Sequence, residues 1–527
     1  MRRPGYSALH LIGLSVGLAC VLLIGLFVRD ELSYDRFHPD ADRIVRLSAQ
    51  GTFDNGFQFS LGGLPDGAAS FLAETLPEVE AITVTSAPFE MTIHAGGERV
   101  VEDGFVYADP HFFDVFGFEL IAGDTSAFWR NDRAVLITPS LAQRVFGDAD
   151  PIGQMLMLGA ESGLEVVGLV ADPPEQSHLQ FSVLQPVETN GEWYMGGRPT
   201  YARLRTMVDT ATVVPALQTA LLDRLADQGA VAFEVEAIPL TRLYLHAAPY
   251  SAAFSSGAGL LRGKAAYVWA FGIAAVLVLL VSCISYVTLA TAQAAGRTRE
   301  VGVRKAVGAG GVQIVRQFLA ETTVLTLSAL IIGVGLAYLA LPALNALTDK
   351  ALRIDPGDPF VWLLFGGVGL IVTLLCGLYP ALGLSRVQPV RALAGRLTIG
   401  RGAWTRRGLV AGQFAISAGL LLCALTMERQ LDFLSQQSLG FAGEQLVRLD
   451  RVRADAYDAF KADLLTLPGV RGVTSAPEFP NSMSGWATFE VASGDTMAKT
   501  TFDVMKTDAD FPATFGATMI AGRYLDA

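Results

Sequence analysis

The sequence predicts an α-helical membrane protein with five transmembrane helices and mixed α/β extracytoplasmic domains. Three observations predict this fold class: a hydrophobic content of 51% with a mean hydropathy of +0.40, five long apolar runs, and a long acidic segment between the first two runs. The composition is too apolar for an ordinary soluble protein, yet 17% of the residues are charged. The chain therefore has enough polar sequence for sizeable domains in water.

The five apolar runs are each long enough to cross a bilayer, whose hydrocarbon core of about 30 Å needs about 20 helical residues. They cover residues 6–28, 267–292, 318–341, 360–384 and 409–427. The first run follows Arg2 and Arg3, as in a signal peptide, but it is longer than a signal core and reaches Arg29 without a small-residue cleavage site. We therefore interpret it as an uncleaved anchor.

The basic residues predict the orientation, because Lys and Arg near span ends are retained in the cytoplasm. Arg2 and Arg3 precede the first span, residues 293–317 hold five basic residues and one acid, and the linker 385–407 holds six arginines and no acid. Residues 29–263 instead hold 14 basic and 32 acidic residues, a difference of −18. We therefore expect a cytoplasmic N-terminus and large domains on the opposite side of the membrane.

The long acidic segment 29–263 alternates short strand and helix patterns, which predicts a mixed α/β domain. We expect strands at 43–47, 81–85, 92–94, 99–101 and 163–170, and helices at 65–76, 139–146 and 210–228. Thr138 and Pro139 are typical of an N-cap and a first helical position. All four cysteines lie in predicted spans and the six histidines have no metal-binding spacing, so we expect neither disulfides nor a metal site.

The chain contains an internal repeat, with displacements of 391 to 404 residues. The matching residues are Asp109 with Asp508, Phe112 with Phe511, Phe116-Gly117 with Phe515-Gly516, Ile121-Ala122-Gly123 with Ile520-Ala521-Gly522, Thr75-Leu76-Pro77 with Thr466-Leu467-Pro468, Val45-Arg46-Leu47 with Val447-Arg448-Leu449, and Arg2-Arg3 with Arg406-Arg407. The duplicated unit is one span, a large outer domain and three spans. We expect the second outer domain, residues 428–527, to be incomplete, and the three spans that would follow it to be missing.

Several segments of the first outer domain together resemble a known family, the duplicated FtsX-like permeases with MacB-like periplasmic core domains. The resemblance lies in Glu31–His38, Asp109–Asp124, Val135–Thr138, Phe146–Gly153 and Ser177–Phe181. It implies the non-catalytic permease subunit of a MacB/FtsX-type ABC transporter in a bacterial inner membrane, with its large domains periplasmic or extracellular. It also implies that a separate cytoplasmic ABC ATPase dimer hydrolyses ATP and drives export or extraction of a substrate such as a peptide, antibiotic or lipoprotein.

The same resemblance implies the partners of the chain and the residues that bind the ATPase. Membrane lipids and, as an optional partner, a periplasmic adaptor protein accompany the ATPase, whereas no nucleic acid and no cofactor are expected. Residues 293–317 resemble the cytoplasmic coupling helix of the family, and we name them the coupling segment. The expected coupling residues are Arg297, Arg299, Glu300, Arg304, Lys305 and Gly308.

A short amphipathic helix with charges on one side and Val301, Val303 and Val307 available to pack is suited to a groove on a soluble partner. Glu300, the one acid among these bases, is placed to pair with Arg304 four residues later. The alternative is a positive-inside loop that binds no partner.

Other motifs argue against catalysis in this chain. The residues Gly13-x-Ser15-x-Gly17 match a nucleophile elbow by letter, but inside a span they are typical of close helix packing, which we predict for Gly13 and Gly17. The segment 259–265 lacks the spacing and the hydroxyl of a nucleotide-binding loop, so we expect no catalytic or cofactor-binding residue. We expect no Asp, Glu, Lys, Arg or His in spans two to five and only His10 in the first span, which makes an ion-coupled carrier the weaker hypothesis. A transmembrane scaffold or signalling protein without transport is the alternative function.

Overall fold

The computed structural model describes residues 4–53, 58–95, 98–158, 162–187, 198–206, 214–219, 221–222, 230–246, 263–385, 400–437, 445–449, 452, 456–476, 486–493, 496–517 and 521. These residues belong to two compact units. Met1–Leu32 and Lys264–Gln436 form a helical unit, and Ser33–Gly263 and Gln437–Ala527 form an α/β unit.

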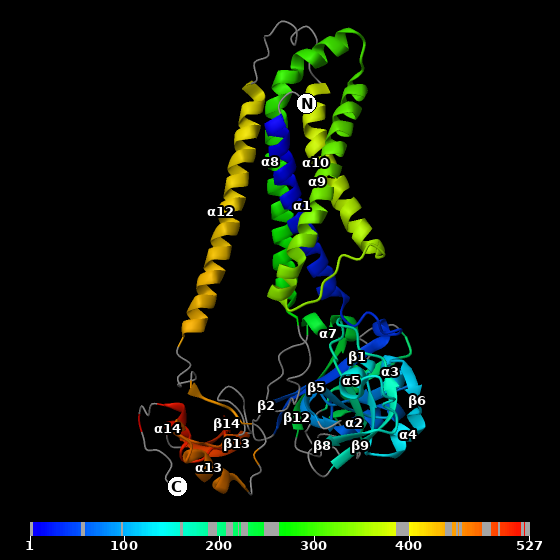
Figure 1. The fold of residues 1–527 in the computed structure, drawn as a ribbon, viewed down its shortest axis with the longest axis vertical. Helices are drawn as coiled ribbons and strands as arrows, with labels where there is room; N and C mark the ends of the chain where they lie inside the picture. Colours follow the sequence, from blue (N-terminus) through cyan, green and yellow to red (C-terminus); the bar gives the residue numbers. More distant parts are fainter. Residues whose placement is uncertain are drawn as a thin grey trace. The chain divides into compact units, whose positions relative to one another are not determined.

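The helical unit contains five helices that are long and apolar enough to cross a membrane (Figure 1). They are α1 (Pro4–Ser33), α8 (Ala265–Ala306), α9 (Gly311–Thr348), α10 (Pro359–Ser385) and α12 (Gly400–Gln436). Each apolar run predicted from the sequence lies inside one of these helices. The helices extend beyond the runs because backbone hydrogen bonding continues in water after the apolar residues end. The largest extension is at the end of α8, which continues to Ala306.

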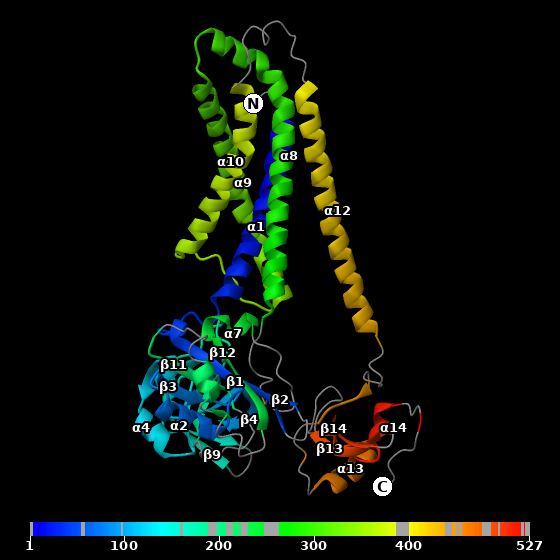
Figure 2. The same cartoon turned by 180° about the vertical axis from the view of Figure 1, so that it is seen from behind.

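Helices α1, α8, α9 and α10 pack around shared apolar clusters. One cluster contains Leu14, Leu18 and Val21 of α1, Cys283 and Tyr286 of α8, Ala329 of α9, and Val368, Val372 and Cys376 of α10. A second contains Leu22 and Leu26 of α1 with Val361 and Phe365 of α10. Helix α12 lies alongside α8 in both views (Figures 1 and 2). Its apolar window has no buried residue among those described.

One residue departs from the expectation about ionisable side chains. Glu321 lies inside the predicted third span, 318–341, and inside α9. The sequence argument against an ion-coupled carrier did not weigh this carboxylate. Because a charge within a membrane-spanning helix is costly, its presence calls for a partner and a role.

The first sheet of the α/β unit is antiparallel. Its order is β12 (Ala230–Pro239), β1 (Ile44–Phe53), β11 (Thr200–Leu204) and β3 (Val79–Val84), and β2 (Gln58–Leu61) pairs with β1. Alternate residues of β1, namely Val45, Leu47 and Ala49, point into a core that α2 (Asp66–Thr75) also lines. The helix predicted at 210–228 lies largely outside the described residues.

The second sheet closes on itself. Its order is β6 (Leu120–Gly123), β9 (Ser162–Val170), β7 (Ala134–Ile137), β10 (Val183–Pro186), β5 (Glu98–Ala108), β4 (Phe89–Ala95) and β8 (Met155–Leu158), and β8 pairs again with β9. The resulting ring of strands is filled by apolar side chains, including Ile93, Phe105, Val135, Leu156 and Val166. Helix α5 (Pro139–Phe146) has the predicted bounds, and its N-cap Thr138 accepts a hydrogen bond from the Leu141 backbone N–H.

A third apolar cluster joins the two sheets. Ile44, Tyr201 and Ile238 come from the first sheet, and Val106, Leu136 and Leu184 from the second. Short helices complete the cluster: Phe112, Val115 and Phe116 belong to α3 (Phe112–Phe116), Phe128 to α4 (Thr125–Arg130), and Leu240 and Leu243 to α7 (Leu240–His246). The two sheets therefore form one continuous domain.

The described residues of the second copy repeat the local geometry of the first. They include α13 (Tyr457–Leu465), the antiparallel strands β13 (Trp486–Ser493) and β14 (Thr496–Asp503), and α14 (Phe511–Phe515). Helix α3 ends at Gly117 with φ 70° and ψ 26°, and α14 ends at Gly516 with φ 68° and ψ 28°. Both glycines adopt the left-handed conformation that favours this residue.

The aspartates predicted to correspond also make corresponding contacts. Asp109 accepts hydrogen bonds from Thr83 Oγ1 at 2.6 Å and from the Val84 backbone N–H at 2.9 Å. Asp508 accepts hydrogen bonds from Thr474 Oγ1 and from the Ser475 backbone N–H at 3.4 Å. These partners are displaced by 391 residues, as are Thr75 and Thr466. The repeat is therefore confirmed in three dimensions.

Candidate functional site

The coupling segment is a helical hairpin formed by the end of α8 and the start of α9. Figure 1 shows the last turns of α8 bending toward the start of α9. Gly308 has φ +104° and ends α8: its N–H donates to the Lys305 carbonyl at 3.1 Å, and the Ala309 N–H donates to the Arg304 carbonyl at 3.0 Å. The segment is thus the continuation of α8 into α9, which corrects the expectation of a separate short helix.

Apolar and polar contacts hold the two arms of the hairpin together. Val301 of α8 is 2% exposed and packs with Ile314 and Phe318 of α9. Arg304 Nη2 lies 2.9 Å from Glu300 Oε1, so the predicted pairing of these residues is confirmed. Arg304 Nη1 also donates a hydrogen bond to Gln317 Oε1 across the hairpin.

The remaining predicted coupling residues lie in different places. Lys305 Nζ donates to the Ser385 carbonyl at the end of α10 at 2.5 Å. Gly308 forms the turn, and the side chains of Arg297 and Arg299 lie outside the described part of the chain. The structure therefore brings Glu300 and Arg304 together and directs Lys305 toward α10.

Three valines at the tip of the hairpin are exposed: Val303, Val307 at 84% and Val312 at 74%. We name Val303, Val307 and Val312 the tip valines. The prediction that Val301 is available to a partner is wrong, because this side chain is used inside the hairpin. Val312 was missed by the sequence reasoning, although it lies four residues after Gly308 on the second arm.

The glycines predicted to pack span one behave differently from each other. A Cβ on Gly17 would lie 1.9 Å from Ser282 Oγ, so only glycine permits the observed approach of α1 to α8. A Cβ on Gly13 would meet no atom of the described residues within 4 Å. Among the described residues, close approach therefore depends on Gly17 and not on Gly13.

Lys350, Asp30 and Glu31 form a cluster of charged residues, which we name the lysine clamp. It joins the connection between α9 and α10 to the end of α1. Lys350 Nζ lies 2.5 Å from Asp30 Oδ2 and 2.6 Å from Glu31 Oε1. Beside it Arg29 pairs with Asp358 and covers the ring of Phe360 at 4.3 Å. The Arg29 guanidinium lowers the pKa of Asp358. The sequence analysis did not find this cluster.

The α/β unit contains a buried polar series built from two of the resemblance segments. His178 Nδ1 lies 2.8 Å from Asp35 Oδ1, and His178 Nε2 lies 2.9 Å from the Tyr201 hydroxyl. Asp35 has φ 59° and donates its backbone N–H to the Gln176 carbonyl at 2.8 Å. All three side chains are buried, so this series fixes the chain that follows α1 rather than contacting a substrate.

His38 lies beside this series and is also buried. Its Nδ1 lies 2.8 Å from the Phe116 carbonyl oxygen. Burial lowers the pKa of His38 to about 4, because the charged imidazolium is poorly solvated in this core. The ring is therefore neutral at pH 7, with Nδ1 donating to the carbonyl.

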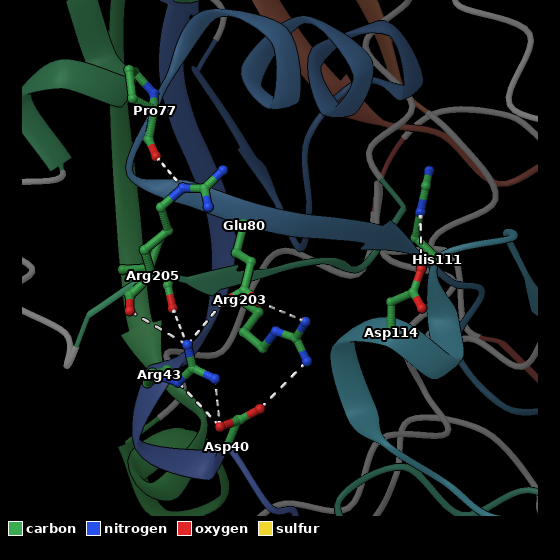
Figure 3. Close-up of polar contacts among 9 residues, drawn as sticks. Asp40, Arg43, Pro77, Glu80, His111, Asp114, Arg203 and Arg205 are labelled. Carbon is green, nitrogen blue, oxygen red and sulfur yellow. Dashed lines mark hydrogen bonds and ion pairs between the residues drawn. The ribbon is translucent and has the colours of Figure 1, made fainter.

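Four charged side chains on the surface of the α/β unit form a ring of ion pairs (Figure 3). Arg43 pairs with Asp40 at 2.6 Å and with Glu80 at 2.8 Å, and Arg203 pairs with Asp40 at 3.4 Å and with Glu80 at 3.0 Å. Two positive and two negative groups neutralise one another. The ring therefore ties the segment before β1 to β3 and β11, and its own four charges sum to zero.

The two copies of the repeated aspartate differ in their surroundings. Burial raises the pKa of Asp109 despite its hydrogen bonds. Burial acts in the same direction on Asp508, but hydrogen bonds from Lys461, Thr474 and Tyr457 lower the pKa of Asp508 to about 2.

Within the described residues, no group of three or more His, Cys, Asp or Glu side chains is arranged to hold a metal ion.

Comparisons with known proteins agree with this architecture. Residues 7–220 match the MacB-like periplasmic core domain, and residues 272–389 match the FtsX-like permease C-terminal domain. These two domain types together place the chain in the class of ABC transporter permeases. The chain belongs to the FtsX/MacB-type ABC permeases.

Individual relatives are distant in sequence. The chain is 26% identical over 335 residues to the macrolide export ATP-binding/permease protein MacB of Shewanella sp. (strain W3-18-1), a match that covers 60% of this chain and 47% of the relative. It is 22% identical over 269 residues to the ABC transporter permease YknZ of Bacillus subtilis (strain 168), which covers 50% of this chain and 62% of YknZ. The chain thus spans about half to two thirds of the length of these relatives.

A solved structure is also similar to part of the chain. The periplasmic region of MacB from Actinobacillus actinomycetemcomitans is 14% identical, with a TM-score of 0.27, and the match covers 36% of this chain and 87% of that structure.

Proposed function

We propose that this chain is the permease subunit of an ABC transporter and that it transmits movement from a separate cytoplasmic ATPase dimer to its α/β domains. In this proposal the five apolar helices cross a bacterial inner membrane with the N-terminus in the cytoplasm. The transported or extracted substrate is of the class handled by such systems, for example a peptide, antibiotic or lipoprotein. The chain itself hydrolyses nothing, and a periplasmic adaptor is an optional further partner.

The observation that carries the proposal is the coupling segment on an FtsX-like permease domain. Its tip valines are exposed although the sequence around them is basic, and Val307 and Val312 are the most exposed of the three. Exposed apolar side chains beside charged ones are suited to an interface, in which the apolar residues are buried and the charges select the partner. The name of the MacB relative pairs ATP binding with a permease, which supports an ATPase as this partner.

The test reverses the charges of the confirmed pair. Glu300→Arg combined with Arg304→Glu keeps an oppositely charged pair four residues apart, so α8 retains its internal contact. The double change loses the hydrogen bond of residue 304 to Gln317 Oε1, so Gln317→Leu, which removes that bond and leaves both charges in place, is the control for ATPase binding. A partner that reads these charges nevertheless meets the opposite signs. We expect binding of the cognate ATPase to weaken more than tenfold, which corresponds to more than about 1.4 kcal/mol.

The measurement is ATPase binding and stimulation of ATP hydrolysis, with the full chain in nanodiscs. Equal binding and stimulation before and after the double change would refute the proposal. A wild-type chain that binds no ATPase would favour the scaffold or signalling alternative.

A topology experiment supplies the control for insertion. Single cysteines at Ile121 and Val307, both exposed, are introduced into a variant that lacks Cys20, Cys283, Cys376 and Cys423. An impermeant thiol reagent should label Ile121→Cys from outside the cell and Val307→Cys only after the membrane is opened. Labelling of both positions from the same side would contradict the proposed orientation.

A further inference from the structure

Glu321 is the one acidic residue of α9, and it lies in the part of that helix assigned to the membrane. Its carboxylate Oε1 accepts a hydrogen bond from Gln317 Nε2 at 3.1 Å, one helical turn closer to the coupling segment. A carboxylate in such a position costs free energy unless polar partners stabilise it. The structure shows such partners.

The hydrogen bond to Gln317 is the inner end of an unbroken series. Gln317 Oε1 accepts a hydrogen bond from Arg304 Nη1, and Arg304 Nη2 pairs with Glu300 Oε1 at 2.9 Å. We name Glu300, Arg304, Gln317 and Glu321 the polar ladder. It crosses from α8 to α9 between Arg304 and Gln317, and then follows α9 into the apolar part of the helix.

The residue after Glu321 lies where three helices meet. Thr322 is buried, and its Oγ1 lies 3.4 Å from the Tyr286 hydroxyl of α8. A Cβ on Gly377 of α10 would lie 3.3 Å from the Thr322 Cβ, so α10 also approaches this position closely. The turn that carries Glu321 is therefore packed against both α8 and α10.

The chemistry of the ladder gives Glu321 an orienting role. An amide side chain can face either way, because its oxygen accepts and its nitrogen donates. Arg304 only donates and a carboxylate at position 321 only accepts, so both ends favour the orientation in which Gln317 presents its oxygen to Arg304 and its nitrogen to Glu321. The guanidinium is then held on α9 as well as on Glu300. A glutamine at position 321 can accept or donate, so it weakens the selection that the carboxylate makes at this end of the ladder.

We propose that Glu321 is a positioning residue for the coupling segment. Through Gln317 it holds Arg304, so that a displacement of the hairpin is passed to the packed turn of α9 beside Tyr286 and Thr322. This inference rests on the proposed function, because the displacement is the one that a bound ATPase would produce.

The first test measures the hairpin alone and needs no partner. Spin labels on Val303→Cys and Val312→Cys, one on each arm, report the distance between the arms in the cysteine-free chain. Glu321→Gln and Gln317→Leu should both broaden the distance distribution. The matched control is Thr323→Val, on the same turn of α9, whose hydroxyl bonds only the Leu319 carbonyl among the described residues. It should leave the distribution unchanged.

The second test measures coupling. With the cognate ATPase bound, Glu321→Gln should lower the stimulation of ATP hydrolysis at least tenfold. The Kd for the ATPase should change less than threefold. The melting temperature should change no more than it does in the control variant Thr323→Val. Gln317→Leu should behave in the same way without altering the carboxylate. Loss of stimulation only in proportion to loss of melting temperature would show a merely structural residue and overturn the inference.

The outcomes separate the two proposals. If wild type and Glu321→Gln give the same distance distribution and the same stimulation, this inference fails and the proposed function stands. If the wild-type chain binds no ATPase, the proposed function fails. The coupling role of Glu321 then fails with it, even if the distance measurement shows that the polar ladder orders the hairpin.

Discussion

Removal of the Lys350 ammonium is predicted to destabilise the helical unit strongly. Lys350 and Asp30 are each 12% exposed and Glu31 is 7% exposed, so the clamp is largely withdrawn from water. Lys350→Met preserves most of the packing of the side-chain stem but leaves two nearby carboxylates without this cation. The clamp joins residues separated by 320 positions in the chain, so its loss also frees the α9–α10 connection from α1.

The magnitude follows from the burial of the three groups. Removing one partner of a buried ion pair typically costs about 3 to 5 kcal/mol, because the remaining charge is left desolvated. Residual exposure of the three groups reduces this cost, so we expect about 3 kcal/mol. Neutralising the acids as well, with Lys350→Met, Asp30→Asn and Glu31→Gln together, should recover most of the loss, since the three groups of the clamp are then all uncharged.

The assay is the free energy of unfolding in mixed micelles, measured by titration with a denaturing detergent and followed by far-ultraviolet circular dichroism. Arg29→Met is the matched control, because the Arg29–Asp358 pair lies at the same end of α1 but its arginine is 38% exposed. It should cost less than Lys350→Met. The reasoning is refuted if both single variants lose the same stability, or if the triple variant is no more stable than Lys350→Met.

Two further predictions concern packing and pH. Gly17→Val should destabilise the contact of α1 with α8 by about 1 to 3 kcal/mol, because the new side chain overlaps Ser282. Gly13→Val is the control, because its side chain meets open space among the described residues. Equal melting temperatures of the two variants would contradict this prediction. The lowered pKa of His38 predicts a stability contribution that is complete above pH 6.5 and is lost as the pH falls toward 4. The difference between the ordinary pKa of 6.5 and the pKa of about 4 in the folded protein corresponds to a total of about 3 kcal/mol. Thermal unfolding of the full chain between pH 7.5 and 4 should show this loss, His38→Gln should reduce it, and an identical pH profile for both proteins would disprove the assignment.

Local features of this protein could be predicted from the sequence alone. The apolar runs lie inside α1, α8, α9, α10 and α12 because hydropathy over about 20 residues is a property of consecutive positions. The pair Glu300–Arg304 follows from the helical period of 3.6 residues, and the cap of α5 follows from Thr138 and Pro139. The repeat was visible as matching residues, and Gly117 and Gly516 then adopt the same backbone conformation because each ends the same short helix.

The relations between distant segments were decided only by the tertiary structure. Val301 and Val303 are both valines of the coupling segment, yet Val301 is buried because Ile314 and Phe318 of α9 pack against it. No spacing rule predicts contacts between separate elements, since these contacts depend on how the elements pack. Examples are Lys350 with Asp30, His178 with Asp35, and Arg304 with Gln317. The sequence alone determined where the apolar helices form and that the chain is duplicated, whereas the orientation that the basic residues predict for these helices stays a prediction. Packing decided which charges are paired and which valines remain exposed, because burial and pairing are set by neighbours in space rather than by neighbours in the chain.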